Sequence, residues 1–405
     1  MATIGGPNTE KDGLVFGYDT GYGVADNNTA TRFYPGENTV NILPSGPAIG
    51  TGDFSRQSYH NESFTYSKVT NYKGRADVHK LYINPSGNTA DPYADFGGQY
   101  HKSGGSAVGD VYALSLDFHV AKGINKPSLG SVYANGYKSP TSAGAASLGT
   151  SIDVDLGDGW TRRTRIATIT AAGNTWWRFG CNTDGNETEV YIDNVQIELK
   201  SHATPFVDGT RSTTQSLIDL TKTTDIDVSN VSFDSTGQPT FDGTDDYLPT
   251  SFTRGTLGDV LTMIAYYKFD GNTSRTYTPV FGGIDSGGGT EFFIGKNSGN
   301  TNIGVQDGNY SGNFVQGSSA WDGNYHQIVY TYNNGIGKIY LDGILKSTGN
   351  FTKCNSAEEI LIGREAEGSG YWFIGDITRA CVYSKVFTAE EVLEDFNALK
   401  NRFDI

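Results

Sequence analysis

The sequence has few cysteines and no long apolar run. Cys181, Cys354 and Cys381 lie far apart and form neither a CxxC pair nor a cysteine–histidine cluster, which excludes a disulfide framework and a zinc site of ordinary spacing. We expect free, buried thiols, as in proteins that fold in a reducing cytoplasm. No apolar stretch approaches the length of a membrane span, and residues 1–12 lack the basic start and apolar run of a signal peptide.

Basic residues are also scarce relative to acidic ones. Lys and Arg total 30 against 45 for Asp and Glu, which gives a formal net charge of −15. A chain with this charge is repelled by phosphate backbones and by anionic lipid surfaces, so we expect neither a nucleic-acid partner nor membrane insertion. Negative charge also keeps a protein soluble, and this interpretation needs no acid-specific function.

Glycine and aromatic residues are abundant. The 405 residues include 53 Gly, 24 Tyr and 21 Phe, a composition that favours short strands joined by tight turns over long helices. The length is that of two domains of ordinary size. We therefore predict an all-β protein with two β-sandwich (jelly-roll) domains.

Alternating side chains indicate individual strands. Residues 112–120 place aromatic and aliphatic side chains on one face and mostly polar ones on the other, which predicts a half-buried strand. Residues 189–199 are expected to close the same domain. In the second half, Asp342-Gly343 tolerates the positive φ angles of a tight hairpin turn. The strands predicted there are 261–269, 291–294, 325–332, 338–341, 344–346, 359–362 and 371–383.

One short helix is expected at the C-terminus. Thr388 can cap its first turn, and Glu391 three residues later completes a capping box. An apolar stripe at helical spacing follows, which we expect to pack on a flank of the second sandwich. Its members are Val392, Leu393, Phe396 and Leu399.

Three segments of the second half carry a family resemblance. Residues 321–343 (WDGNYHQIVYTYNNGIGKIYLDG) place a Trp and a His before a strand, a turn and a strand ending in Asp-Gly. They resemble the core hairpin of laminin-G-like, concanavalin A-like jelly rolls. Residues 241–248 (FDGTDDYL) resemble an early strand of that family, and residues 374–385 (IGDITRACVYSK) resemble its closing strand.

The first half resembles a different module. Residues 112–120, 158–162 (DGWTR) and 191–198 (YIDNVQIE) are similar to galactose-binding-like carbohydrate-binding modules. Residues 13–21 (GLVFGYDTG), however, resemble the opening strand of the laminin-G-like domain, which suggests that the module is inserted after that strand. The predicted domains are a 1–12 arm, a 13–33 first strand region, an inserted 34–208 module and a 209–405 jelly roll.

The opening segment, residues 204–212 (TPFVDGTRS) and residues 391–403 (EVLEDFNALKNRF) together resemble virion structural proteins of tailed bacteriophages, of the tail fibre or surface decoration type. The resemblance implies assembly in the host cytoplasm, release by lysis and localisation in the virion. It implies contacts with other virion proteins, a homo-oligomer and host attachment through a glycan. A secreted or surface glycan-processing enzyme, or a carbohydrate-binding protein of cellular origin, is the alternative.

No catalytic pattern is present. Sandwich glucanases carry their two carboxylates on one strand in the pattern ExDxxE, which this sequence lacks. It also lacks GxSxG, a phosphate-binding loop and HExxH. Glu187 and Glu189 lie next to a turn, as solvated residues do, and we expect His326 to be structural. We predict a non-enzymatic protein.

The sequence offers candidate ligands for a structural calcium ion, which both resembled families often hold with carboxylates at loop ends. Asp193 occupies the position that commonly contributes to the ion site in galactose-binding-like modules. Asp242, Asp245 and Asp246 cluster in the second domain. An Asx-turn or a strand-end cap is the alternative at each position.

Exposed aromatic rings are the expected sugar contacts, with Trp176 and Trp177 as the candidates for carbohydrate binding. Adjacent strand residues point to opposite faces, so at most one of the two belongs to the core. Core packing or a subunit contact is the alternative, and the same choice applies to Trp372.

Overall fold

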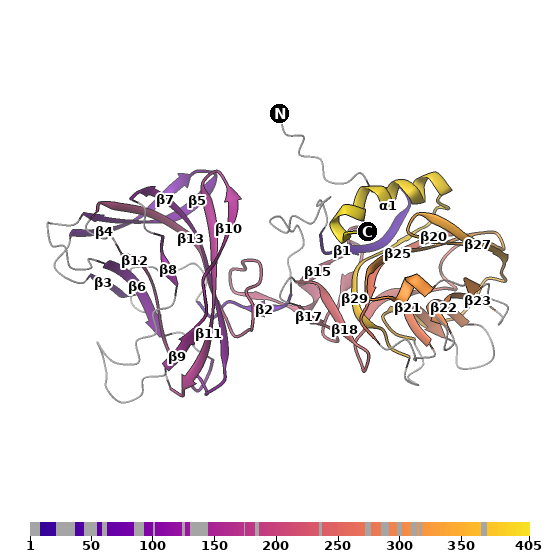
Figure 1. The fold of residues 1–405 in the computed structure, drawn as a ribbon, viewed down its shortest axis with the longest axis horizontal. Coiled ribbons are helices and arrows are strands. Elements are labelled where there is room, and N and C mark those ends of the chain that lie inside the picture. The colour runs from indigo at the N-terminus through magenta and orange to yellow at the C-terminus, as the bar shows by residue number, and fades with distance from the viewer. Residues whose placement is uncertain are drawn as a thin grey trace. The chain divides into compact units, whose positions relative to one another are not determined.

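Figure 1 shows the fold in the computed structural model. Contacts divide the chain into two compact units. Unit 1 consists of Met1–Asn38 and Ser212–Ile405, and unit 2 of Thr39–Arg211. The predicted inserted module is 34–208, and the linker Pro35-Gly36 lies outside the described residues. The structure describes residues 9–21, 37–43, 55–58, 63–84, 93–99, 102–123, 126–129, 145–173, 175–182, 186–234, 237–271, 277–284, 291–297, 302–308, 314–315, 318–365 and 371–405.

Unit 1 is a sandwich of two antiparallel sheets. One has eight strands in the order β17-β18-β29-β20-β25-β26-β27, with β1 also beside β29, and the other has six in the order β19-β28-β21-β22-β23-β24. The elements of unit 1 are β1 Leu14–Asp19, η1 Thr213–Gln215, β15 Leu217–Ile218, β16 Asp225–Ile226, β17 Ser232–Phe233, β18 Pro239–Asp242, β19 Leu248–Thr253, β20 Val260–Phe269, β21 Tyr277–Ile284, β22 Glu291–Asn297, β23 Asn302–Gly308, β24 Phe314–Val315, η2 Ser318–Trp321, β25 Tyr325–Asn333, β26 Ile336–Leu341, β27 Ile344–Asn350, β28 Glu359–Ile362, β29 Ile374–Tyr383 and α1 Ala389–Phe403.

Unit 2 is a second sandwich. A seven-stranded sheet in the order β10-β11-β7-β13-β5-β4, with β9 also beside β11, packs over a four-stranded sheet, β3-β6-β12-β8. The predicted all-β class is therefore confirmed. The strands of unit 2 are β2 Thr39–Val40, β3 Ser55–Ser58, β4 Ser63–Tyr72, β5 Arg75–Asn84, β6 Tyr93–Gln99, β7 Val111–Lys122, β8 Ser128–Leu129, β9 Ala145–Leu148, β10 Ile152–Gly157, β11 Trp160–Ala171, β12 Trp176–Asn182, β13 Thr188–Glu198 and β14 Thr210–Arg211.

Strand β20 is buried on both faces, because unit 1 has two apolar layers. Met263 and Ala265 belong to the core between the two sheets. Ile264 and Tyr266 belong to a second core, under α1, where the Tyr266 ring stacks on Phe403 with centroids 4.8 Å apart. Figure 1 shows the helix lying over the eight-stranded sheet. None of the helices in the described residues has the length and apolarity of a membrane span.

The local signals in the sequence predict the hairpin turn and the helix start correctly. Asp342 and Gly343 have φ angles of 51° and 74°, as a tight hairpin turn requires. Thr388 accepts a hydrogen bond from the Glu391 amide, and the Glu391 side chain returns one to complete the capping box. The prediction is wrong for one member of the stripe, because Leu393 is 45% exposed. The buried face of the helix continues to Phe403.

Strand β1 precedes unit 2 in the chain, but it belongs to the eight-stranded sheet of unit 1. It runs antiparallel to β29, from the pair Leu14–Tyr383 to the pair Asp19–Arg379. Thr20 extends the pairing by donating its amide to Thr378 O over 3.1 Å. The chain thus leaves unit 1 after β1, forms unit 2 and returns at Ser212.

The sequence prediction for 112–120 fails on one face of the strand. Leu116 lies in the core of unit 2, as expected, but Asp117 on the opposite face is only 2% exposed. Asp117 is buried because Arg75 and Arg162 donate to its two carboxylate oxygens over 2.8 and 2.9 Å. Two guanidinium groups compensate the buried charge, so a polar side chain there does not indicate an exposed face.

A buried ion pair joins α1 to the sheet beneath it. The two terminal nitrogens of Arg379 on β29 donate to the two carboxylate oxygens of Asp395 on α1, over 2.9 and 3.0 Å. Gln327 Nε2 donates to the same carboxylate over 2.9 Å, and the Tyr266 hydroxyl donates over 3.2 Å. Arg379 and Asp395 are each 2% exposed, so removal of either charge leaves the other uncompensated.

Replacement of Asp395 tests this dependence. Asp395→Ala is expected to lower the free energy of unfolding by about 3–5 kcal/mol, because the buried Arg379 charge loses its partner. The neighbouring exposed Glu394→Ala is the control and should change stability by less than about 0.5 kcal/mol. Urea unfolding followed by tryptophan fluorescence measures both, and equal effects of the two variants would contradict the assignment.

Candidate functional site

Two chain connections meet at one rim of unit 1. The first runs from Asp242, the last residue of β18, to β19, and the second runs from β28 to β29, so each crosses between the two sheets. Gly363 brings them together, since it has a φ of 82° and a Cβ there would lie 2.4 Å from the Phe241 ring. Glycine is therefore required at Gly363, and it places Arg364 beside the first connection.

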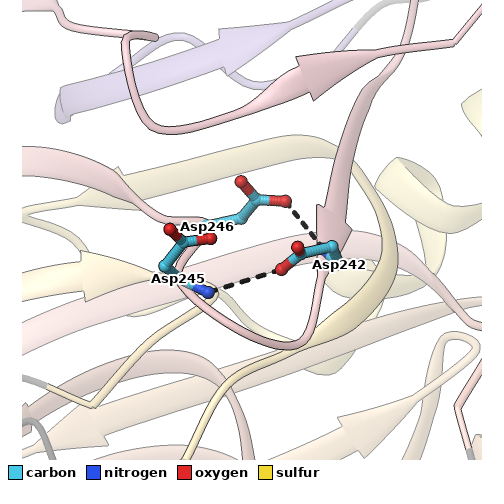
Figure 2. A group of neighbouring side chains, drawn as sticks. All are labelled: Asp242, Asp245 and Asp246. Atoms are coloured by element: carbon cyan, nitrogen blue, oxygen red, sulfur yellow. Dashed lines mark hydrogen bonds between the residues drawn. The ribbon is translucent and has the colours of Figure 1, made fainter.

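Asp242, Asp245 and Asp246 form a carboxylate cluster on the first connection. One oxygen from each lies within 4.8 Å of the others, and Figure 2 shows the three side chains gathered around one turn of the chain. Asp242 Oδ1 accepts the amides of Thr244 and Asp245 over 2.7 and 3.4 Å, and Asp246 Oδ2 accepts the Asp242 amide over 2.7 Å. The Asx-turn is thus present, and it still leaves carboxylate oxygens available.

None of the basic residues in the described segments forms an ion pair with Asp242, Asp245 or Asp246. Burial raises the pKa of Asp246 to about 6, the charges of Asp242 and Asp245 add to the increase, and the hydrogen bond from the Asp242 amide opposes it. Three such oxygens suit a hard divalent cation, which prefers carboxylate ligands. The donor set therefore fits calcium.

An arginine lies over two aromatic rings next to this cluster. Arg364 Cζ lies 4.3 Å from the ring centroid of Trp372 and 5.0 Å from that of Tyr247, the residue that follows Asp246. The centroids of the two rings are 6.5 Å apart. All three side chains are half-buried, and we call them the Arg364 platform.

The guanidinium of Arg364 is short of polar partners. Its Nε atom is buried with no hydrogen-bond partner, and none of the described carboxylates forms an ion pair with it. Tyr371, which precedes Trp372, forms a separate ring contact with Tyr277, with the centroids 4.9 Å apart. Sequence analysis identified Trp372 as a candidate but not Arg364 or Tyr247, and only the position of Tyr247 next to three aspartates signalled it.

The two tryptophans predicted to bind sugar lie on β12 in unit 2. Trp177 is 0% exposed in the core, with its ring 5.2 Å from that of Tyr112. The prediction for Trp177 is therefore wrong, because a ring enclosed by the core cannot stack on a sugar. Strand position gives Trp176 the opposite face, and its side chain lies outside the described part of the structure.

Asp193, the predicted calcium ligand of unit 2, has an arginine as its counter-ion. Arg75 Nη1 lies 2.8 Å from Asp193 Oδ2 and 2.8 Å from Asp117 Oδ2. A guanidinium between the two carboxylates occupies the place of a metal ion, so Asp193 is better explained as a structural ion pair. The carboxylate cluster of unit 1 is the only group of three acidic, His or Cys ligands found among the described residues.

The other acidic and histidine candidates have structural partners. Glu189 pairs with Lys80 over 2.8 Å, and Glu187 pairs with Lys122 over 3.0 Å. His326 lies between two aspartates, with Nδ1 2.8 Å from Asp342 and Nε2 3.2 Å from Asp322. Burial lowers the pKa of His326, but both carboxylates raise it and prevail. Both ring nitrogens are engaged, which suits a structural residue.

Comparison with known families places the rim site in a sandwich of known type. Residues 242–393 match the family model of the concanavalin A-like lectin/glucanases superfamily, and this segment includes the carboxylate cluster and the Arg364 platform. No curated protein matches the chain. The match covers less than half of the chain, and unit 2 lies entirely outside it.

Solved structures similar to parts of the chain include domain 4 of AbnA, an extracellular GH43 arabinanase from Geobacillus stearothermophilus, in complex with arabinotriose. It has 15% identity and a TM-score of 0.31, with 39% of this chain and 75% of that chain covered. The Ruminococcus gnavus IT-sialidase CBM40 bound to α2,3 sialyllactose has 15% identity and a TM-score of 0.30, with 34% and 82% covered. The receptor binding domain of botulinum neurotoxin type G has 19% identity and a TM-score of 0.35, and the match spans 44% of this chain and 48% of the toxin chain. At these scores the likeness carries no information on ligands.

Proposed function

We propose that the protein is a non-enzymatic virion structural protein of a tailed bacteriophage, a tail fibre or surface decoration protein that attaches to glycans through unit 1. The observation that carries the glycan-binding part is the Arg364 platform beside the carboxylate cluster. Trp372 and Tyr247 offer flat apolar rings for the C–H face of a pyranose. Arg364 offers N–H donors to sugar hydroxyls, and the carboxylates accept hydrogen bonds from them.

Calcium belongs to this proposal as a structural ion held by Asp242, Asp245 and Asp246. Bound there, it supplies positive charge among three carboxylates and open coordination positions for sugar hydroxyls. The charged form of Asp246 is disfavoured in the folded protein, because its pKa is raised to about 6. Folding without the ion is therefore penalised in full above that pH, and the penalty shrinks as the pH falls from about 6 towards the ordinary aspartate pKa of the unfolded chain, below which it is absent.

Asp246→Asn is expected to abolish stabilisation by calcium. For wild type, free calcium at about 100 times Kd should raise the free energy of unfolding by about 2.7 kcal/mol. This gain should shrink as the pH falls below about 6, where Asp246 is protonated. At about pH 7.5 without calcium, Asp246→Asn should be more stable than wild type, because it removes the disfavoured charge.

Calorimetric unfolding in calcium and in EDTA, at about pH 7.5 and pH 5, measures these effects through Tm. Asp225→Asn, an exposed position on β16, is the control and should behave as wild type. A calcium-induced rise in Tm that persists in Asp246→Asn would place the ion elsewhere.

Trp372→Ala tests the sugar contact. We expect at least about a tenfold loss of affinity for the best ligand of a glycan array, which corresponds to about 1.4 kcal/mol of lost stacking. Arg364→Ala should weaken binding to the same ligand, while Tyr82→Ala, a half-buried tyrosine of unit 2, should leave it unchanged. Full binding by folded Trp372→Ala and Arg364→Ala would refute the rim site, and loss in Trp176→Ala would move the site to unit 2.

The virion assignment is supported by the sequence resemblance of the opening segment, the linker and the C-terminal helix to tailed-phage proteins. Gold-labelled antibodies against the protein should decorate purified particles, at fibre tips for a tail fibre or over the head for a decoration protein. The cellular alternative predicts unlabelled particles. Release of reducing ends from a polysaccharide panel by the purified protein would favour the glycan-processing enzyme instead.

A further inference from the structure

Strand β10 forms an open edge of unit 2. It is the terminal strand of the seven-stranded sheet, and among the described residues it pairs on one side only, with β11. All six of its residues are exposed. The backbone donors and acceptors on its other side therefore face solvent, and such an edge is a template for another strand.

The side chains of β10 favour pairing and do not prevent it. Ile152, Val154 and Leu156 form an apolar row on one face and are 62%, 38% and 40% exposed. The opposite edge strand, β4, carries an exposed lysine, Lys68, of the kind that protects edges from association. β10 has no lysine, arginine or proline.

Charge alternates along the other face of β10. Asp153 Oδ1 accepts from Arg163 Nε over 2.7 Å, and Lys126 Nζ lies 2.8 Å from Asp153 Oδ2, so this group of three has one net positive charge. Asp155 has no ion pair among the described residues, and its Oδ1 accepts the Gly157 amide over 2.9 Å. One strand thus presents a positive position at 153 and a negative position at 155.

We propose that two copies of the chain associate through β10, antiparallel about a two-fold axis at Val154. In this register Val154 lies opposite its symmetry mate, Ile152 opposite Leu156 of the second copy, and Asp155 opposite the positive Asp153 group of the second copy. The Val154 pair lies on the axis and occurs once, and every other contact occurs twice, as two-fold symmetry requires. The seven-stranded sheets of both copies become one continuous sheet.

The charges select this register over its neighbours. A shift of the two-fold axis to Asp155 would place two unpaired carboxylates opposite each other, and a shift to Asp153 would oppose two positive groups. Like charges directly opposite in a sheet are destabilising. A shift of the pairing by a single residue would place the apolar face of one strand opposite the charged face of the other. The axis at Val154 is the arrangement in which apolar side chains meet and opposite charges face each other.

Sedimentation velocity of the full chain over a range of concentrations tests the proposal, which does not depend on glycan binding. Wild type should form a dimer, and Val154→Lys, which places two ammonium groups at the axis, should raise the dimer Kd at least about a hundredfold, or roughly 2.8 kcal/mol. Val108→Lys is the control, because Val108 is 65% exposed in the same unit and lies outside β10.

Charge exchange tests the register. Asp155→Lys should weaken the dimer, and adding Lys126→Glu should restore it, because the new lysine then faces a negative Asp153 group. Val154→Cys should form an intermolecular disulfide under mild oxidation, since opposite residues in a sheet have Cα atoms about 4.5–5.5 Å apart. Val108→Cys should not.

Two results would overturn the proposal. The first is a wild type that stays monomeric at every concentration, which would leave β10 for a different protein strand. The second is a dimer that Val154→Lys leaves intact and Val154→Cys does not cross-link. The cysteine variant keeps the test decisive if the lysine variant fails to fold.

Discussion

Unit 1 depends on strand β29, because two strands, β18 and β1, pair with one edge of it. Along its other edge β29 pairs with β20 from Gly375 to Tyr383. On the shared edge, β18 pairs with its first residues and β1 with its last. Asp19 at the end of β1 lies 2.7 Å from Arg402 of α1 and 3.6 Å from Arg379. A strand that precedes unit 2 in the chain thus completes both the sheet and the charge balance beneath the helix, and the connection before β29 supplies Arg364 and Trp372 of the rim site.

Charge compensation separates the structural parts of the molecule from the site. The buried carboxylates Asp117, Asp307 and Asp395 each receive an arginine, as the cost of burying a charge requires. Asp307 also accepts from the Tyr330 hydroxyl over 3.0 Å. The carboxylate cluster and Arg364 differ from these buried pairs. Both lie at the same rim of unit 1, and neither has an ion pair among the described residues. A polar ligand with an apolar face requires charged groups without a partner beside partly accessible rings, and this rim offers both.

The sequence predicts what local chemistry decides. Alternation, turn residues and a capping box locate the hairpin around Asp342-Gly343 and the start of α1, because these signals act within a few residues. The sequence does not separate Trp176 from Trp177, since alternation says that neighbours differ but not which one points inward. It also does not reveal the Arg364 platform. Arg364 and Tyr247 are distant in the chain, and only the two connections between sheets bring them together.

Sugar binding and self-association occupy different units in our proposals, and this separation has a consequence for attachment. A half-buried platform of two rings and one guanidinium contacts a small part of a glycan, so a single site binds weakly. Pairing through β10 uses no residue of the rim site, and each dimer therefore presents two sites. Binding by the second site is then intramolecular, which raises the overall affinity without a new contact wherever the two sites reach glycans on one surface. On the proposed virus particle, many copies would extend the same gain, so that individually weak sites would together give firm attachment.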